Sequence, residues 1–306
     1  MSDKDWDELL YSIDEQGCTP FIGAGACSFL NEDHMPWLPL GRTISNKMSD
    51  DYEYPLDDFN ELDKVSQFVA IQHGDMVPKN FIIRWLKRIN PPDFSKKEYK
   101  NTPHAVLADL KLPLYITTNY DEFMEAALKS RNTIPTSEFC RWNSFLRKQK
   151  NVNTVFEKID YKPSRDSPLV YHLHGHLNHP QSIVLTETDY LDFLINLSKE
   201  EILPDQISTA LNSTSLLFVG YSLRDINFRF IFRGLMQLLG EGIGAGLQLP
   251  SIAVQFPSGF SKEKKEQAIG YLTDYTKNMF KVRAYWGDIM EFSKELRDRW
   301  EKFKNA

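Results

Sequence analysis

The chain has 306 residues and a mass of 35.6 kDa, enough for two domains of ordinary size or one large α/β domain with insertions. Hydrophobic residues make up 42% and charged residues 25%, which excludes a disordered or fibrous protein. The formal net charge of −6 has the wrong sign for a surface that grips nucleic acid, so we expect no direct nucleic-acid partner.

The cysteines and the hydropathy pattern indicate the compartment. Cys18, Cys27 and Cys140 include no C-x-x-C pair, so they support neither a zinc ribbon nor a disulfide framework. The N-terminus is acidic and lacks the apolar segment of a signal peptide, and no apolar run approaches the ~18 residues that a bilayer requires. We therefore expect a cytoplasmic protein with reduced thiols and no membrane partner.

The first third of the chain begins with an amphipathic helix that ends at Gly17 and leads into a first strand, TPFIGAGA. Residues 31–60 are rich in Asp, Pro and Asn and predict a loop. Residues 61–90 predict two amphipathic helices with no strand between them. We therefore expect a mainly helical insertion over about 31–100 that forms a small subdomain.

The remainder alternates between strand and helix patterns. A short helix opens at Pro103, and the segments 112–119, 167–176, 213–220, 249–256 and 279–286 predict buried strands, each followed by polar residues or a helix. Residues 183–197 predict a strand-like start and then a helix, 226–239 a helix, and 131–167 little regular structure. This alternation predicts an α/β fold with a Rossmann-like, mostly parallel sheet of five or six strands, helices on both faces and a C-terminal helix over about 287–306.

Glycine-rich or polar clusters follow most of these strands. In open parallel sheets ligands bind beyond the carboxyl ends of the strands, so these clusters are the candidate site. The glycines Gly23 and Gly25 let the backbone approach a phosphate next to a helix N-terminus. The pattern alone has low specificity, because G-x-G occurs in many tight turns and Ser28 takes the usual third glycine position.

The polar residues after the second strand have a structural and a functional interpretation. Asp121 is placed to cap the helix DEFMEAALKS, as Asp does before many helices. That role leaves Asn119 on the loop with less structural reason to be there, and it becomes the better candidate for chemistry.

Three histidines follow the strand SPLVYHLHGH. If the strand stays regular, its period of two places His172, His174 and His176 on one face. We expect His172 to be a satisfied core histidine and His174, which precedes Gly175, to emerge toward the crevice as an acid or base. Three imidazoles could also bind zinc in a metal-dependent hydrolase, although the other histidines show no metal-ligand spacing.

In chain order, FIGAGACS, TTNYD, HLHGH and GYSLRD resemble the dinucleotide-binding motifs of the sirtuin (silent information regulator) superfamily. More closely, they resemble its sirtuin-like NAD hydrolases from bacterial anti-phage defence. The resemblance implies that residues 1–306 form a single NAD-binding domain, with NAD as the substrate and with Asn119 and His174 as the catalytic residues. It also implies a set of NAD-binding residues: Gly23, Ala24, Gly25, Ser28, Thr118, Asp121, Gly220, Ser222, Asp225 and Asp288.

One departure from the superfamily bears on the reaction. Its protein deacylases carry a four-cysteine zinc module, which three scattered cysteines cannot build, so we expect the helical insertion to replace that module and no metal to be needed. The resemblance then implies NAD hydrolysis to nicotinamide and ADP-ribose, with a cyclised ADP-ribose as an open alternative. An NAD-dependent deacylase and a module that senses NAD or ADP-ribose without cleaving it are the competing functions.

The mechanism implied for NAD cleavage follows from its cationic leaving group, which makes orientation and charge stabilisation the main requirements. Asn119 would fix a ribose hydroxyl or the attacking water, His174 would act as general base, and Asp121 would hold the nicotinamide amide. By analogy with the family we also expect a homo-oligomer, with a separately encoded ATPase or Argonaute-type protein as a further partner.

Overall fold

The computed structural model describes residues 1–31, 34–149, 153–158, 160–199, 202–222, 229, 233, 251–256 and 263–305. Seven parallel strands form one sheet in the order β3-β4-β2-β1-β5-β6-β7. Their bounds are β1 Cys18–Ile22, β2 Leu114–Thr117, β3 Thr136–Phe139, β4 Leu169–His172, β5 Ser215–Val219, β6 Ser251–Gln255 and β7 Val282–Trp286.

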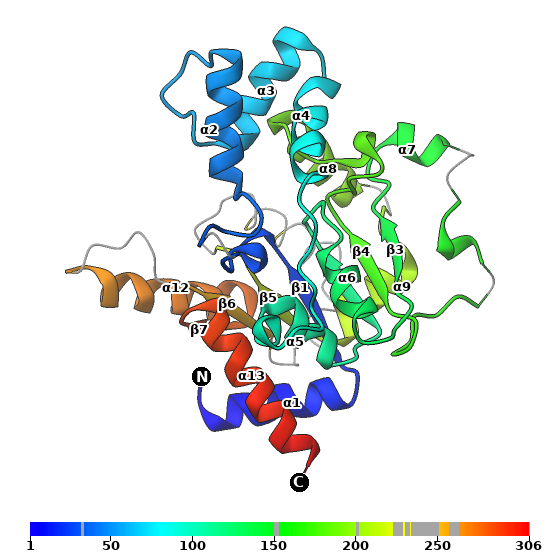
Figure 1. The fold of residues 1–306 in the computed structure, drawn as a ribbon, viewed down its shortest axis with the longest axis vertical. Coiled ribbons are helices and arrows are strands. Elements are labelled where there is room, and N and C mark those ends of the chain that lie inside the picture. The colour runs from blue at the N-terminus through cyan, green and yellow to red at the C-terminus, as the bar shows by residue number, and fades with distance from the viewer. Residues whose placement is uncertain are drawn as a thin grey trace.

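The helices flank this sheet on both faces (Figure 1). Those of the described residues are α1 Asp3–Asp14, α2 Gly41–Tyr52, α3 Leu62–His73, α4 Met76–Leu86, α5 Pro103–Asp109, α6 Phe123–Lys129, α7 Ser144–Lys148, α8 Glu187–Lys199, α9 Asp205–Ser213, α12 Lys265–Phe280 and α13 Ile289–Lys304. Short 3-10 turns add η1 Ala24–Cys27, η2 Lys97–Tyr99, η3 Val155–Glu157 and η4 Pro180–Ser182.

Alternating strand side chains divide the core into two layers. In β2, Tyr115 belongs to the layer beneath α1, α5, α6 and α13, and its neighbour Ile116 to the layer beneath α7, α8, α9 and α12. The central strands are buried along their whole length, which explains why they are continuous apolar runs in the sequence. The predicted doubly covered parallel sheet is confirmed.

Three sequence-based expectations for individual elements are wrong. Residues 41–52, predicted as loop, form the polar helix α2. Residues 136–139, in a segment without periodicity, form the edge strand β3, which brings the sheet to seven strands rather than five or six. Residues 183–185, predicted as the start of a strand, are buried without joining the sheet. The helix predicted over 226–239 lies almost entirely outside the described residues.

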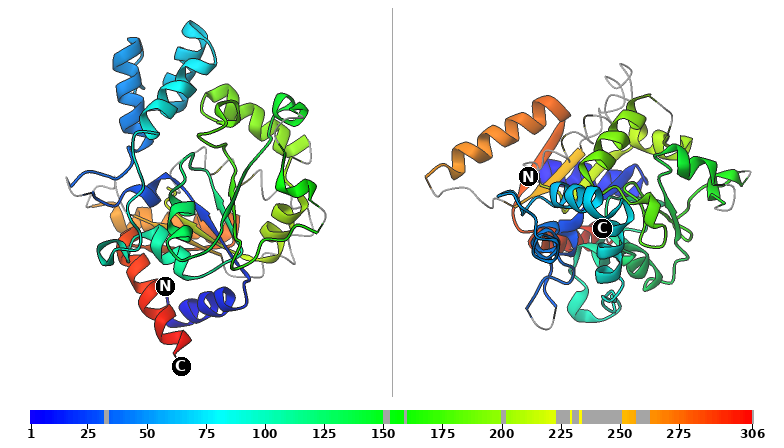
Figure 2. Two further views of the ribbon diagram at one scale, coloured as in Figure 1. Left: turned by 45° about the vertical axis from the view of Figure 1, so that its right-hand side comes forward. Right: turned by 90° about the horizontal axis from the view of Figure 1, so that it is seen from above.

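The helices α2, α3 and α4 stand at one end of the molecule, and α1 and α13 lie at the other (Figure 1; Figure 2, left). Helix α4 packs on η4, which follows β4, so the insertion lies on the side of the carboxyl strand ends. A largely buried ion pair between Lys79 Nζ and Asp189 Oδ1, 3.0 Å apart, joins α4 to α8. Asp189 Oδ2 also accepts hydrogen bonds from the Leu185 and Thr186 amides, which ties the insertion to the loop after β4.

Ion pairs and aromatic contacts join the two terminal helices. Arg299 pairs with Asp3, and Lys304 with Asp14, while Trp6 stacks on Phe292 with ring centroids 5.4 Å apart.

None of the helices in the described part of the chain combines the length and apolarity that a membrane span requires.

Candidate active site

Backbone hydrogen bonds join the turns that follow β1, β2 and β5. The Gly23 amide donates to Val219 O and the Gly25 amide to Gly220 O, both at 2.9 Å, and the Thr118 amide donates to Ile22 O at 3.0 Å. These turns therefore form one continuous floor at the carboxyl ends of neighbouring strands, the place where this fold class binds its ligands.

The glycines of this floor lie against one another. Gly220 has φ +85°, and a Cβ there would lie 2.3 Å from the Ala26 amide nitrogen and 2.5 Å from Gly23 O. A Cβ on Gly23 or Gly25 would lie 2.8 or 2.9 Å from Gly220 O. The glycine pattern thus has a structural cause that the sequence did not reveal, namely close contact between two turns.

Most amides of the first turn are used within the protein. Those of Gly23, Gly25, Ala26 and Ser28 donate to backbone carbonyls, and Ser28 Oγ donates to Gly25 O. Ala24 is the exposed residue of η1, and a first-turn amide has no acceptor within its own helix. Its amide is therefore the group of this turn best placed to meet an anion.

Asn119 is held over the first turn. Its backbone amide donates to Thr117 Oγ1 at 2.9 Å, and its side-chain Nδ2 donates to Gly23 O at 3.3 Å and lies 3.7 Å from Cys27 Sγ. No hydrogen bond among the described residues reaches its Oδ1. Asn119 is 8% exposed, and its side-chain amide is oriented by the bonds of Nδ2. Its Oδ1 is therefore available as a hydrogen-bond acceptor at the strand ends.

Asp121 has the capping role expected for it and also takes part in a buried polar cluster. Its Oδ1 accepts the Phe123 amide at the start of α6 (2.9 Å), and Cys27 Sγ donates to its Oδ2 (3.9 Å). Burial raises the pKa of Asp121 to about 6 and that of Cys27 well above its usual value. The cluster continues to His104, whose Nε2 lies 3.9 Å from Cys27 Sγ and whose pKa burial lowers to about 4.

A testable consequence is that Asp121→Asn stabilises the protein above pH 6. An acid whose pKa rises from 3.8 to about 6 on folding binds its proton more tightly when folded, so the free energy of unfolding falls as the pH rises from about 4 to about 6. The shift corresponds to about 3 kcal/mol at most. Thermal melts should show Asp121→Asn above wild type at pH 8 and level with it at pH 3.5.

The matched control for that measurement is Asp192→Asn, because Asp192 is exposed on α8. It should melt like wild type at both pH values. An Asp121→Asn protein that is less stable than wild type at pH 8 would contradict the prediction.

The three histidines do not share one face. Strand β4 ends at His172, and Gly175 has φ +92°, which breaks the period of two. The rings of His172 and His176 meet edge to face with centroids 4.5 Å apart. The His174 ring instead packs on Tyr190 and Phe193, with centroids 5.6 and 5.2 Å away, so the expected common face is wrong.

His174 is buried rather than open to a crevice, with 3% of its surface exposed. Its carbonyl accepts the Val184 amide at 2.9 Å, while its Nε2 has no hydrogen-bond partner among the described residues. Burial lowers the pKa of His174 to about 3, so the ring is neutral at physiological pH. The unpartnered nitrogen of a neutral imidazole can accept a hydrogen bond, whereas the low pKa makes His174 a weak base in this buried state.

Of the other predicted binding residues, Thr118 and Ser222 lie at or near the turns that form the floor, and Asp288 lies farther away. Thr118 Oγ1 lies 2.8 Å from the Tyr221 hydroxyl, which donates to Ile22 O, and Ser222 is exposed beyond it. Asp225 lies outside the described residues. Asp288 caps α13 by accepting the amides of residues 290 and 291, and it follows the edge strand β7, two strands beyond β5.

Glu125, His172 and His176 bring one potential ligand atom each within 4.8 Å of one another, which raises the question of a metal. His176 Nδ1 accepts the Asn178 amide at 3.1 Å, so its proton sits on Nε2 and that atom has no lone pair to offer. Burial, first of all, lowers the pKa of His176 to about 3, which agrees with a neutral ring. In that tautomer His176 offers the group no ligand atom, and His174 takes no part in the group.

Four residues of this region had no role in the predicted site. Cys27 and His104 flank Asn119 and Asp121, Tyr221 spans the turns, and Glu125 pairs with His172. Tyr221 and Cys27 lie inside two of the quoted motifs, GYSLRD and FIGAGACS, which was a usable signal for both. His104 and Glu125 lie outside the motifs, and their contacts with this region arise only through the fold.

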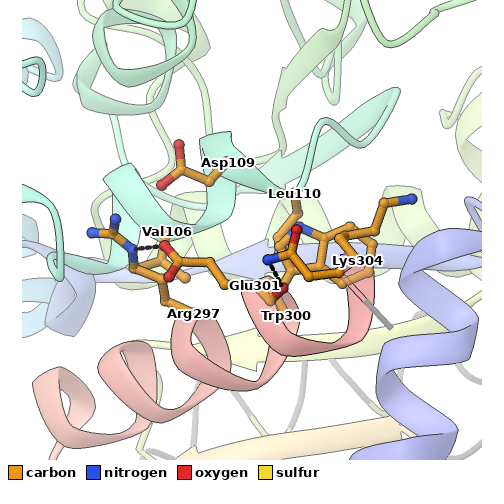
Figure 3. Close-up of a pocket in the computed structure, with 8 residues that line it drawn as sticks. Val106, Asp109, Leu110, Arg297, Trp300, Glu301 and Lys304 are labelled. Carbon is orange, nitrogen blue, oxygen red and sulfur yellow. Dashed lines mark hydrogen bonds and ion pairs between the residues drawn. The ribbon is translucent and has the colours of Figure 1, made fainter.

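A hollow of about 350 Å³ between α5 and α13 is not a comparable site (Figure 3). Its charged groups are paired: Arg297 Nε lies 2.8 Å from Glu301 Oε1, and Lys304 Nζ lies 2.8 Å from Asp14 Oδ1. Self-paired charges leave it without the convergent free groups found around Asn119.

A parallel sheet covered on both faces, with a polar cluster at its carboxyl strand ends, defines a Rossmann-like α/β protein. The SIR2-like domain model matches residues 113–275, more than half of the chain. The chain therefore belongs to the SIR2-like family, which confirms the resemblance seen in the motifs.

Several curated relatives carry the name NAD(+) hydrolase ThsA. The protein of Bacillus cereus (strain MSX-D12) is 28% identical over 218 residues, which cover 71% of this chain and 39% of that protein. The protein of Cytobacillus dafuensis is 25% identical over 240 residues (76% and 41%), and that of Acinetobacter baumannii (strain 532279) is 25% identical over 228 residues (74% and 40%). The chain thus spans about two fifths of the length of these relatives.

Proposed function

We propose that the protein is an NAD⁺ glycohydrolase that cleaves the bond between nicotinamide and ribose and releases nicotinamide and ADP-ribose. One observation carries the proposal. Asn119, which uses its Nδ2 within the protein and keeps its Oδ1 available, and His174, whose buried Nε2 has no partner among the described residues, follow the adjacent strands β2 and β4. The names of the curated relatives support the same substrate and reaction.

The division of labour follows from the chemistry of the bond. Nicotinamide leaves as a neutral molecule from a cationic ring, so the enzyme must orient the ribose and stabilise an oxocarbenium-like state more than it must donate a proton. Asn119 Oδ1 would accept a hydrogen bond from a ribose hydroxyl or from the attacking water. His174 Nε2, neutral at physiological pH, would accept a hydrogen bond from that water or from the hydroxyl. Its low pKa makes it a weak base, so it would take the proton as the water bonds to the oxocarbenium-like carbon and becomes acidic.

The remaining site residues would bind the substrate. Asp121 would hold the nicotinamide amide, and the Ala24 amide would meet the pyrophosphate at the turn formed by Gly23, Gly25 and Ser28. Thr118, Gly220 and Ser222 would line the neighbouring turns, and Asp225 and Asp288 would serve the adenosine end. The capping role of Asp288 makes it the weakest member of this set.

The biological role that we propose is depletion of NAD in anti-phage defence, in the cytoplasm. Such an activity must be restrained until infection, and assembly into a homo-oligomer, alone or with a separately encoded ATPase or Argonaute-type protein, would provide the restraint. The helical insertion would stand in the place of the zinc module of protein deacylases.

The test is to incubate the purified protein with NAD, before and after forced changes in its oligomeric state, and to separate the products by chromatography. We expect nicotinamide with ADP-ribose from wild type, and about a thousandfold slower product formation from Asn119→Ala. A cyclised ADP-ribose as product would still show cleavage of the bond between nicotinamide and ribose, but by internal attack rather than by water. If the protein binds NAD or ADP-ribose but forms no product in any oligomeric state, the result would contradict NAD hydrolysis and support the sensing function instead.

We expect chelation to leave the activity intact, because His176 with its proton on Nε2 offers no ligand atom to the cluster with Glu125 and His172. NAD cleavage measured after dialysis against EDTA is expected to stay within about twofold of the untreated rate, since no metal-bound nucleophile is involved. A loss of activity that zinc restores would support the metal-dependent alternative.

A further inference from the structure

We propose that His172 is a positioning residue for Asn119, that it acts through the Asn119 backbone carbonyl, and that Glu125 locks it in place. The inference rests on the proposed NAD cleavage, because the importance of the position of Asn119 follows from that reaction. It assigns a functional role to two buried residues that do not contact the substrate.

The geometry connects the three residues directly. His172 Nδ1 lies 2.9 Å from Asn119 O, and its Nε2 lies 2.8 Å from Glu125 Oε1. His172 is fully buried and Glu125 is 3% exposed, so neither contact competes with bulk water. Glu125 Oε1 also accepts the Ser137 hydroxyl from β3 at 2.6 Å, which fixes the carboxylate from a second side.

These contacts close a ring around the turn between β2 and α6. Asn119 and Glu125 lie six residues apart along the chain, at the start of this turn and in the first turns of α6. The imidazole of His172, from the neighbouring strand β4, bridges them. The backbone from Asn119 to Glu125, which includes Asp121, is therefore held at both of its ends by the same imidazole.

The protonation state of His172 decides whether both of its ring nitrogens can donate hydrogen bonds. Both ring nitrogens face oxygen acceptors, and a neutral imidazole has only one N–H to donate. Burial opposes the charge, but the Glu125 carboxylate outweighs it and raises the pKa of His172, while the pKa of Glu125 is lowered by the same pair. The charged ring can donate to Asn119 O and to Glu125 at once.

A merely structural ion pair would not need to end on Asn119. Arg131 Nε pairs with Asp109 Oδ1 at 2.6 Å on the same side of the sheet. The further hydrogen bonds of Arg131 go to Phe94 O, Ser130 Oγ and Ala105 O, and none goes to Asn119. This pair therefore supplies a matched control within the chain.

The test uses three variants of the full chain. His172→Phe keeps a ring and removes both donors, and kcat for NAD cleavage should fall about 10- to 100-fold with KM changed less than about threefold, because a displacement of about 1 Å costs this much in rate. Glu125→Leu should fall by a similar or smaller factor. Glu125→Gln should keep kcat within about threefold, since its amide can donate to His172 Nε2 while Nδ1–H still donates to Asn119 O.

Two comparisons separate positioning from general stability. The double variant His172→Phe with Glu125→Leu should have the kcat of His172→Phe alone, because Glu125 acts through His172. Asp109→Asn should keep wild-type kcat although it removes an ion pair of similar length.

A second readout needs no turnover, and it separates failure of this inference from failure of the proposed function. Hydrogen exchange of the amides in residues 117–122 should quicken in Glu125→Leu and stay at the wild-type rate in Glu125→Gln, even if wild type proves unable to cleave NAD. Equal exchange in both variants, or a His172→Phe protein with wild-type kcat, would overturn the role. If His172→Phe does not fold, the contrast between the two Glu125 variants decides.

Discussion

Replacing Asn119 by alanine is expected to lower the rate of NAD cleavage about a thousandfold, which is the usual scale for removing a group that orients or stabilises the reacting atoms. Asn119 sits at the end of β2 with its Nδ2 committed to Gly23 O, so its Oδ1 is the atom that alanine removes from the substrate side. Product formation measured by chromatography tests this, and circular dichroism should show an unchanged fold.

His174→Ala should give a loss of similar size, because it removes the nitrogen that lacks a protein partner. Two matched variants control for the substitution itself: Asn212→Ala on α9 and His73→Ala on α3 replace exposed side chains of the same types. Both should retain wild-type turnover. Near-normal cleavage by Asn119→Ala and His174→Ala together would remove these residues from the mechanism.

The strands and helices that could be predicted from the sequence are those whose packing requires a local pattern of residues. The strands β1, β2, β4, β5 and β6 are apolar on both faces, and residues such as Pro103 and Asp288 mark helix starts directly. Because parallel strands end at one edge, the motifs that follow them could be grouped into one candidate site from the sequence alone.

The elements that escaped prediction have local sequences without such a pattern. Strand β3 is four residues long, sits at the edge of the sheet, and has the half-exposed sequence TSEF, so its pairing with β4 is what makes it a strand. Helix α2 has only four buried positions, two of them serines. The apolar residues 183–185 imitate a strand, but they pack beside β4 without a free edge to join.

The site shows the same division between local and long-range information. Asp121 as a cap depends on residues two positions away and could be predicted. The contact of His172 with Glu125 spans 47 residues, and the separation of His174 from its two neighbours depends on the positive φ of Gly175. Sequence spacing does not reveal either feature. The first depends on the packing of β4 against α6, and the second on where β4 ends.

Burial and polarity oppose each other in this region, and the balance has a functional meaning. Asp121 carries a raised pKa, and His174 Nε2 and His104 Nδ1 have no hydrogen-bond partner among the described residues. Each of these groups costs free energy of folding when buried in this state. A fold under selection for stability alone would replace them, so their presence favours a role that a substrate completes.

Gly220→Ala is expected to destabilise the protein by about 3 kcal/mol or more, the sum of a left-handed backbone penalty and an overpacking penalty. Its φ of +85° disfavours any side chain, and the new Cβ would lie 2.3 Å from the Ala26 amide nitrogen, an atom of the backbone that cannot rotate away. The turns after β1 and β5 must then separate, which also displaces Ala24 and Asn119. Urea unfolding should show the loss of stability, and any folded fraction should bind NAD more weakly.

Gly270→Ala is the matched control, because Gly270 lies within α12 and a Cβ there meets no atom within 4 Å. The same chemical change should stabilise the protein by up to about 1 kcal/mol, since alanine is the better helix former. The two substitutions thus have opposite expected signs for one added methyl group. If Gly220→Ala unfolds at the same urea concentration as Gly270→Ala, close contact between the two turns is not what requires glycine at position 220.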